Sequence, residues 1–386
     1  MNFFIRKRCL CAIITLTVFS ATAASSTASG DAKPTDCNAL TKEQLASALA
    51  FEFGDMDKLW KIIDQLKSGS DPLPEQWNSL ASGPGYESLI KEEIPKDVLL
   101  EAIRTAFLPS KQTQQKQWRE QGKAALRLVE HFIELDLKRR EVTNLLLQLK
   151  QEQGTLSQHA TELACGYFSH PAGERWPRFS VAFAAFQKDA RGYSSSIVMD
   201  PLFALEAGDN LVYWLAHETH HILRHTVTVS TTRNAMSATN ESLVWVLHQL
   251  QSEGIGDQID KRHTFFNDGY LAHSKFAKFF RDEVTNAPAR IAELDVLIRD
   301  LQECQQDCDT IDERIRETAV MAGHPLGFFM AETIDRTLGR EALLADIGNP
   351  AQFLVSYNRA ALKSSKDLPL FSDSSLEYVL RLFTDL

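Results

Sequence analysis

The stretch Leu215-Ala216-His217-Glu218-Thr219-His220-His221-Ile222-Leu223 contains the pattern H-E-x-x-H. Its apolar flanks predict a buried helix that carries one polar face. Residues i and i+4 of a helix share a face about 6 Å apart, so His217 and His221 could bind one metal ion. Glu218, rotated by about 100°, could reach a water at an open coordination position. A zinc ion lowers the pKa of such a water to about 7, and a carboxylate can take its proton.

The alternative interpretation of this stretch is a chance match on a helix that happens to carry histidines. The chain has 11 histidines among 386 residues. A random H-E-x-x-H is therefore expected in about a few per cent of such chains. The helical setting of the pattern favours a metal site over chance. We therefore predict zinc (Zn2+) as the cofactor.

A third zinc ligand should follow, because catalytic zinc usually binds three protein ligands and a water. Two glutamates compete for this role. Glu241 lies twenty positions after His221, but it follows the good N-cap residue Asn240, and an acid there also suits the helix dipole. Glu253 is favoured, because Asp257 stands one turn later and could accept the spare N–H of a ligand histidine.

Two glycines, Gly254 and Gly256, lie around this acid. Each weakens a helix by roughly 1 kcal/mol relative to alanine. Their placement predicts a close approach of another part of the chain to the helix. A frayed helix with surface acids is the alternative.

The two motifs together resemble the gluzincin metallopeptidase plan of H-E-x-x-H followed by E-x-x-x-D. More closely, 215–221 with 253–260 is similar to a little-characterised bacterial family of zinc-dependent peptidases, best over about 178–260. Gly256 departs from that family, where many relatives carry alanine. The resemblance implies a zincin-like catalytic core and peptide or protein substrates. It also implies site roles: zinc ligands His217, His221 and Glu253, general base Glu218, and Asp257 beside the ligands.

Two further stretches, Gly323-His324-Pro325-x-Gly327 and Tyr357-Asn358, also resemble that family. The first predicts a helix start, and His324 there could stabilise the oxyanion that forms when a carbonyl is attacked. Tyr357 could serve the same purpose. A structural role is the alternative for each of these two residues.

The predicted fold class is α+β and predominantly helical, with a small sheet preceding the H-E-x-x-H helix. Residues 178–186 and 194–200 have the pattern of two short strands joined by a turn around 189–192. Helical patterns cover roughly 59–66, 97–107, 117–149, 154–165 and 240–260, with a break at 70–74 and an interruption at Gly154. The expected organisation is a leader at 24–36, an N-terminal helical lobe at 37–175 and a zincin-like catalytic lobe at 176–386. The two lobes should form one compact body.

The N-terminus has the pattern of a secretory signal peptide, residues 1–23. Three basic residues at 6–8 precede an apolar stretch, and Ala21-Thr22-Ala23 offers a cleavage site. The stretch is shorter than the about 20 residues that a membrane span needs. We therefore expect a periplasmic or secreted protein with no integral membrane segment. Its formal net charge of −10 argues against nucleic acid as a partner.

Four cysteines follow the predicted cleavage site: Cys37, Cys165, Cys304 and Cys308. On one helix, Cys304 and Cys308 would lie a turn apart, and their Cβ atoms would be farther apart than the ~3.8 Å that a disulfide prefers. Pairing of these two with Cys37 and Cys165 is therefore expected in an oxidising compartment.

Overall fold

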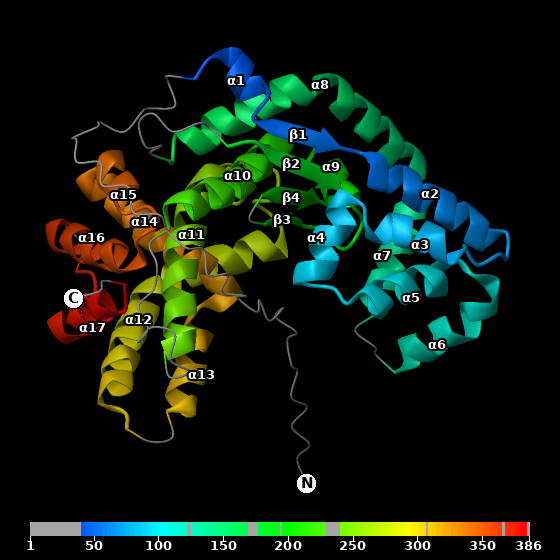
Figure 1. Ribbon diagram of the computed structural model, residues 1–386. Coiled ribbons are helices and arrows are strands. Elements are labelled where there is room, and N and C mark those ends of the chain that lie inside the picture. The colour runs from blue at the N-terminus through cyan, green and yellow to red at the C-terminus, as the bar shows by residue number, and fades with distance from the viewer. Residues whose placement is uncertain are drawn as a thin grey trace, which may run out of the picture. The chain divides into compact units, whose positions relative to one another are not determined.

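The computed structural model (Figure 1) describes the chain from residue 40 to residue 383 with gaps, so the predicted signal peptide and leader lie outside the described residues. The protein is α+β and mostly helical, as predicted, with a small four-stranded sheet. No helix in the described part has a stretch both long and apolar enough to cross a membrane. The described ranges are 40–121, 125–168, 177–193, 195–228, 240–305, 308–364 and 367–383.

The chain folds into two compact units. Unit 1 comprises 51–151 and 180–206, and unit 2 comprises 40–50, 152–179 and 207–383. Each unit therefore combines segments that are separate in the sequence. The sequence-based division into consecutive lobes at 175/176 stays a prediction.

Unit 1 contains a set of short helices whose apolar residues recur at helical spacing. In α2, Leu59, Ile63 and Leu66 are fully buried along one stripe, as a core-facing helix requires. The predicted break after this helix is confirmed, because Gly69 takes a positive φ of 89° and α3 begins at Pro74. The helices are α2 (Gly54–Lys67), α3 (Pro74–Ala81), α4 (Pro84–Glu92), α5 (Lys96–Phe107), η2 (Pro109–Lys111), α6 (Gln112–Glu120), α7 (Leu126–Leu137) and α9 (Pro201–Ala207).

The sheet has the strand order β1-β2-β4-β3. The sequence predicted two strands joined by a turn, but the turn region itself forms a strand, β3 (Ala190–Gly192). Strand β4 (Ser196–Met199) is buried along its whole length, so both of its edges need hydrogen-bond partners. It pairs in parallel with β2 (Phe179–Phe183) and antiparallel with β3. Strand β1 spans Leu49–Glu52.

The long helix α8 (Arg139–Cys165) runs through residues of both units. The predicted interruption at Gly154 is wrong, because the helix continues through it. One glycine costs a helix only about 1 kcal/mol, and buried neighbours such as Leu149 and Ala160 hold the helix in place. The predicted continuous helix over 117–149 is also wrong, because α6, α7 and α8 are separate there.

Unit 2 is built from longer helices around a large apolar cluster. Its centre is α11 (Glu241–Thr264), which packs closely against α14 (His324–Leu338) and α10 (Leu211–Val227). The cluster draws on α11, α12, α14 and α16 and includes Leu247, Leu294 and Phe353. The other elements are α1 (Lys42–Ala46), η3 (Gly208–Asn210), α12 (Lys275–Glu303), α13 (Asp309–Thr318), η5 (Val320–Gly323), α15 (Arg340–Ala345), α16 (Pro350–Lys363) and α17 (Asp373–Phe383).

Helices α11 and α14 cross at two glycines, as the glycines beside Glu253 led us to expect. A Cβ on Gly254 would lie 2.3 Å from the carbonyl oxygen of Gly327. A Cβ on Gly327 would lie 2.2 Å from the carbonyl oxygen of Leu250. Both distances are far inside van der Waals contact, so the crossing requires glycine on both helices. The crossing fixes α14, and His324 at its start, against the helix that carries Glu253.

We expect Gly254→Ala to destabilise the protein by about 1–3 kcal/mol, because the added methyl must push two backbones apart. Thermal unfolding of the purified variant measures this effect. The matched control is Gly154→Ala in α8, where the nearest atom to a Cβ is the Ala46 Cβ at 3.9 Å. The control should be more stable than the parent by about 0.5–1 kcal/mol. An unchanged melting temperature for Gly254→Ala would contradict the close crossing.

A disulfide joins Cys304 to Cys308, with their Cα atoms 6.0 Å apart. The prediction that these two would not pair is wrong, because they do not share a helix. Helix α12 ends at Glu303, and Cys308 is the N-cap of α13. Because the backbone at Cys304 is extended, helical geometry no longer holds the two Cβ atoms apart, and the cysteines can come close enough to form a disulfide. Cys165 is disulfide-bonded as well, whereas Cys37 lies outside the described residues.

Candidate metal centre

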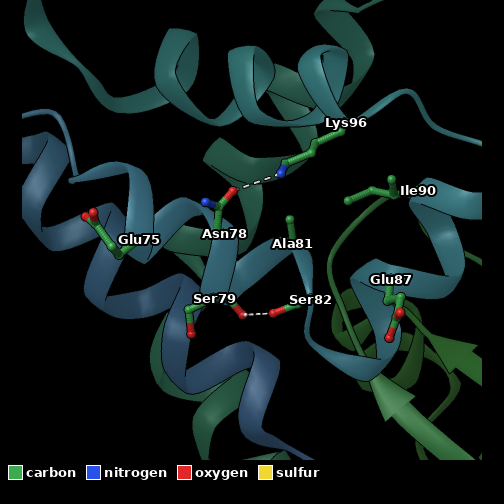
Figure 2. Close-up of a pocket in the computed structure, with 8 residues that line it drawn as sticks. All are labelled: Glu75, Asn78, Ser79, Ala81, Ser82, Glu87, Ile90 and Lys96. Atoms are coloured by element: carbon green, nitrogen blue, oxygen red, sulfur yellow. Dashed lines mark hydrogen bonds between the residues drawn. The ribbon is translucent and has the colours of Figure 1, made fainter.

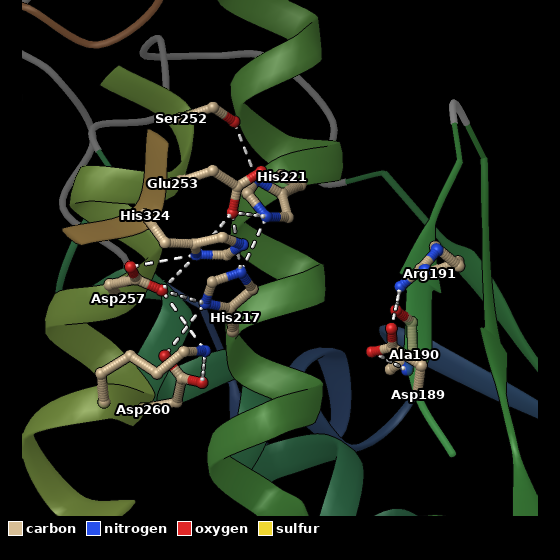
Figure 3. Close-up of polar contacts among 11 residues, drawn as sticks. Asp189, Ala190, Arg191, His217, His221, Ser252, Glu253, Asp257, Asp260 and His324 are labelled. Atoms are coloured by element: carbon tan, nitrogen blue, oxygen red, sulfur yellow. Dashed lines mark hydrogen bonds and ion pairs between the residues drawn. The ribbon is translucent and has the colours of Figure 1, made fainter. Parts of the chain in front are cut away.

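Helix α10 places the H-E-x-x-H residues on a firmly held surface. Leu215, Ala216, Ile222 and Leu223 are at most 1 % exposed, so the apolar side of the helix is anchored in the core. The opposite side then faces α11. Figure 3 shows His217 and His221 pointing from α10 toward Glu253 on α11. The local sequence pattern thus fixes the direction of both imidazoles.

Three potential ligand atoms converge between the two helices. The Nε2 atoms of His217 and His221 lie 2.8 Å apart. The Oε2 atom of Glu253 lies 3.4 Å from His217 Nε2 and 3.2 Å from His221 Nε2. Glu241, the competing glutamate, is exposed in the first turn of α11. The structure therefore brings Glu253, and not Glu241, to the two histidines.

The outer nitrogens of the two imidazoles are held by polar partners. His217 Nδ1 lies 3.0 Å from Asp260 Oδ1. A carboxylate only accepts, so this nitrogen donates its hydrogen, and Nε2 is the nitrogen left to bind a metal ion in place of a proton. His221 Nδ1 lies 2.8 Å from the hydroxyl of Ser252. Both rings are thereby turned with Nε2 toward Glu253, the orientation that a metal-binding histidine needs.

The donor set fits a tetrahedral zinc ion. Zinc binds nitrogen and oxygen at about 2.0–2.2 Å, so ligand atoms at its corners lie about 3.3 Å apart. The two distances from Glu253 Oε2 to the histidines, 3.4 and 3.2 Å, match this edge, whereas the 2.8 Å between the two Nε2 atoms is shorter, so the imidazoles would move apart slightly around the ion. The buried Oε2 atom also has no hydrogen-bond partner among the described residues, and a buried anion requires one. A bound cation would supply that missing partner.

The ionisation of Glu253 suits this role. Burial alone would raise the pKa of its carboxyl, but the nearby His221 and His324 hold that pKa well below its usual range. For His217, burial alone would lower the imidazole pKa, whereas the charge of Asp260 raises it overall. Glu253 is therefore a carboxylate, the form that binds a cation.

Glu218 lies on the same turn of α10 as His217, about 100° round the helix. It is 8 % exposed. Among the described residues, no hydrogen bond or ion pair involves its carboxylate, so the group is free to receive a proton. Gly256 lies close against the His217 ring, since a Cβ there would be 2.9 Å from His217 Cε1. This close contact accounts for glycine at a position where alanine would press on the ring.

Asp257 reaches the centre, but it binds a different histidine from the one expected. Its two carboxylate oxygens lie 2.9 and 3.0 Å from His324 Nδ1. Its distance to His217 Nδ1 is 3.7 Å, beyond a hydrogen bond. Asp260 makes the hydrogen bond to His217 instead. The prediction that Asp257 orients a ligand histidine is corrected accordingly.

His324 is brought to the centre by an unusual backbone segment. Three consecutive residues before it, Met321, Ala322 and Gly323, have positive φ angles of 52°, 56° and 88°. Strain of this kind is kept where the surrounding structure enforces it, often at functional sites. The predicted helix start is confirmed, because α14 begins at His324. The His324 ring lies 6.0 Å from the His217 ring with 25° between their planes.

Tyr357 lies elsewhere in unit 2. It is fully buried in the apolar cluster and packs against Phe329 and Phe371. Its hydroxyl donates to the carbonyl oxygen of Pro369 at 3.1 Å, and burial raises its pKa. Among the described residues, no interaction joins Tyr357 to the metal centre. The structure gives this residue a place in the core.

Sequence reasoning missed three polar residues of the centre: Ser252, Asp260 and Lys261. A signal for Asp260 was present, because Glu253, Asp257 and Asp260 are spaced i, i+4 and i+7 and so share one face of α11. Ser252 and Lys261 adjoin residues of that face. Which histidine or aspartate these three residues contact depends on the packing of α10 and α14 against α11.

Unit 1 contains a pocket outside this centre, lined by polar residues of α3 and α4 (Figure 2). Lys96, at the start of α5, donates to Asn78 Oδ1 across it at 2.9 Å. No histidine or cysteine lines the pocket, and it has no metal-binding set. Its lining residues are Glu75, Asn78, Ser79, Ala81, Ser82, Glu87, Ile90 and Lys96.

A family model with the description "Putative zinc dependent peptidase (DUF5700)" matches residues 77–366. The chain belongs to this family. The match includes α10, α11 and α14, so it covers every residue of the metal centre. Zinc is therefore the cofactor, and peptide hydrolysis is the activity that the family description gives. No curated protein and no solved structure matches the chain.

Proposed function

We propose that this protein is an exported zinc metallopeptidase of gluzincin type, with His217, His221 and Glu253 as ligands. The convergence of His217 Nε2, His221 Nε2 and Glu253 Oε2 carries the proposal. Two nitrogens and one oxygen from three side chains leave a fourth tetrahedral position for water, the arrangement of a catalytic zinc site. A structural zinc site would fill all four positions with protein atoms.

Glu218 is the proposed general base. Zinc, when bound, lowers the pKa of its water and polarises a scissile carbonyl. The Glu218 carboxylate has no partner among the described residues, so it can take the proton from the attacking water. It can then pass that proton to the leaving amine, since one carboxylate can act first as base and then as acid.

His324 is the proposed stabiliser of the oxyanion. Asp257 holds its Nδ1, so the ring is fixed before substrate binds and Nε2 is left for another partner. Burial would lower the His324 pKa, but Asp257 and Glu253 raise it overall. A histidine that carries its second proton can donate a hydrogen bond to an oxyanion. A donor that is already fixed in place stabilises the oxyanion most strongly where water is scarce. Tyr357 has no part in the proposed mechanism.

Export is the second part of the proposal. The basic and apolar pattern of residues 1–23 is that of a signal peptide. The Cys304–Cys308 disulfide supports an oxidising compartment. We therefore propose that the mature protein acts in the periplasm or outside the cell.

A peptide-library digest tests the proposed activity. The purified, zinc-loaded protein should cleave peptides, and a chelator should stop the cleavage until zinc is restored. Mass spectrometry of the products would identify the cleaved bonds. A zinc-loaded protein that leaves the library intact would instead support a zinc-binding protein without peptidase activity. Hydrolysis of small amides alone would support an amidase.

A further inference from the structure

Lys261 is a buried lysine at the base of the metal centre. It is only 4 % exposed, and its Nζ lies 2.5 Å from Asp260 Oδ2 and 3.3 Å from Asp257 Oδ1. These two aspartates are the partners of His217 and His324. A single ammonium group therefore stands at the junction of both aspartate–histidine pairs.

Aromatic rings form the other side of the Lys261 site. The ammonium lies 4.3 Å from the centre of the Trp214 ring and 5.5 Å from that of Phe265. The Trp214 ring is itself fixed, because its Nε1 donates to the Tyr270 hydroxyl at 2.8 Å. A desolvated ammonium over an aromatic face gains cation–π stabilisation and has few other positions to occupy. The charge of Lys261 is thus held in one place.

The charge balance on α11 requires such a cation. Glu253, Asp257 and Asp260 share one face of the helix, and the two aspartates are fully buried. Buried carboxylates that face one another repel unless a cation compensates their charge. Lys261 Nζ supplies that cation, because it contacts both Asp260 and Asp257.

The same position argues against a second metal ion in this network. The sets His217–Asp257–Asp260 and Glu253–Asp257–His324 also bring ligand atoms within 4.8 Å of one another. Lys261 Nζ already contacts both aspartates of the first set and Asp257 of the second. A divalent cation bound to these aspartates would be repelled by the ammonium at short range in a water-poor site. We therefore expect one metal ion in the centre.

We propose that Lys261 is a positioning residue that joins the two aspartate–histidine pairs, so that the zinc ligand His217 and the oxyanion donor His324 are oriented together. The part that concerns His324 rests on the proposed peptidase function. The part that concerns His217 rests only on zinc binding. The two parts can therefore fail separately.

Zinc affinity, measured by competition with a chromophoric chelator, tests the His217 part. Lys261→Met keeps an apolar stem over Trp214 but removes the charge, and we expect it to weaken zinc binding about 10–100-fold. Lys261→Arg should recover most of this loss, since it restores the cation. The matched control is Lys188→Met in unit 1, where the lysine also bridges two acids, Glu134 at 2.8 Å and Glu206 at 2.5 Å. The control should bind zinc like the parent.

A double-mutant comparison separates positioning from general destabilisation. If Lys261 acts on zinc through Asp260, Lys261→Met should add little to the loss already caused by Asp260→Asn. A lysine with only a structural role would lower the melting temperature of these variants without changing zinc affinity. Should Lys261→Met fail to fold, the charge-balanced Lys261→Met/Asp260→Asn variant decides the question. It should bind zinc as weakly as Asp260→Asn alone.

Three results would overturn the proposal. The first is parental zinc affinity in a folded Lys261→Met protein or in the charge-balanced variant. The second is a full, additive loss in the double mutant. The third is two equivalents of zinc bound per parental chain. The part that concerns His324 is tested by kcat at saturating zinc. If the Lys261→Met/Asp260→Asn protein has a lower kcat than the Asp260→Asn protein, that part is supported. An equal kcat would overturn that part alone.

Discussion

Glu218→Gln is expected to lower kcat for peptide cleavage by about 10²–10⁴-fold while the protein still binds zinc. The amide has nearly the shape of the carboxylate but cannot take a proton from water at neutral pH. Zinc affinity should stay close to the parental value, because the three ligand atoms come from other residues. Steady-state kinetics and metal analysis of the same sample measure the two effects.

The control for this variant is Glu241→Gln. Glu241 is also a glutamate near the motif in sequence, but it is exposed in the first turn of α11. The Glu241→Gln protein should keep the parental activity and the parental zinc content. A Glu218→Gln protein that cleaves peptides at the parental rate would exclude Glu218 as the base. A loss of zinc from that variant would show instead that Glu218 supports metal binding.

Glu253→Ala is expected to weaken zinc binding by more than about 100-fold. Removal of an outer partner of a ligand costs 10–100-fold, and loss of a ligand should cost more. The remaining two histidines would leave zinc with too few protein ligands for a stable site. Chelator competition gives the affinity, and dialysed protein should lose its metal and its peptidase activity together.

Glu241→Ala is the matched control here, because it removes the other candidate for the third ligand. Its zinc affinity should equal that of the parent. If Glu241→Ala lost zinc and Glu253→Ala kept it, the assignment of the third ligand would be reversed. Glu253→Asp adds a graded comparison, since the shorter side chain keeps the charge but cannot reach the Nε2 atoms at 3.2 and 3.4 Å without a shift.

The two histidines of the centre could be predicted because their relation is local. Residues four apart on a helix face the same way whatever surrounds the helix. Their apolar neighbours, such as Leu215 and Leu223, showed which side of the helix is buried. The choice of Glu253 over Glu241 came from a pattern on a second helix. The structure places Glu253, and not Glu241, beside the two histidines.

The partners of the histidines could not be predicted so well. Asp257 and Asp260 both lie on the correct face of α11, and only the packing of α10 and α14 decides which aspartate meets which histidine. The place of Tyr357 could not be predicted for a related reason. A tyrosine within a helix is as compatible with a core position as with a catalytic one, and only the packing of the helix shows which it occupies. The Cys304–Cys308 bridge was missed because α12 ends one residue before Cys304.

The sequence by itself determined the helical class, and it predicted the H-E-x-x-H helix as the metal-binding helix and Glu253 as the third ligand, since these follow from periodicity and short spacings. The tertiary structure decided which side chains orient those ligands and how close the helices come. The crossing at Gly254 and Gly327 and the ammonium of Lys261 show why. Contacts between distant segments depend on how whole helix faces pack. The spacing of residues along one segment does not show which other segment will pack against it.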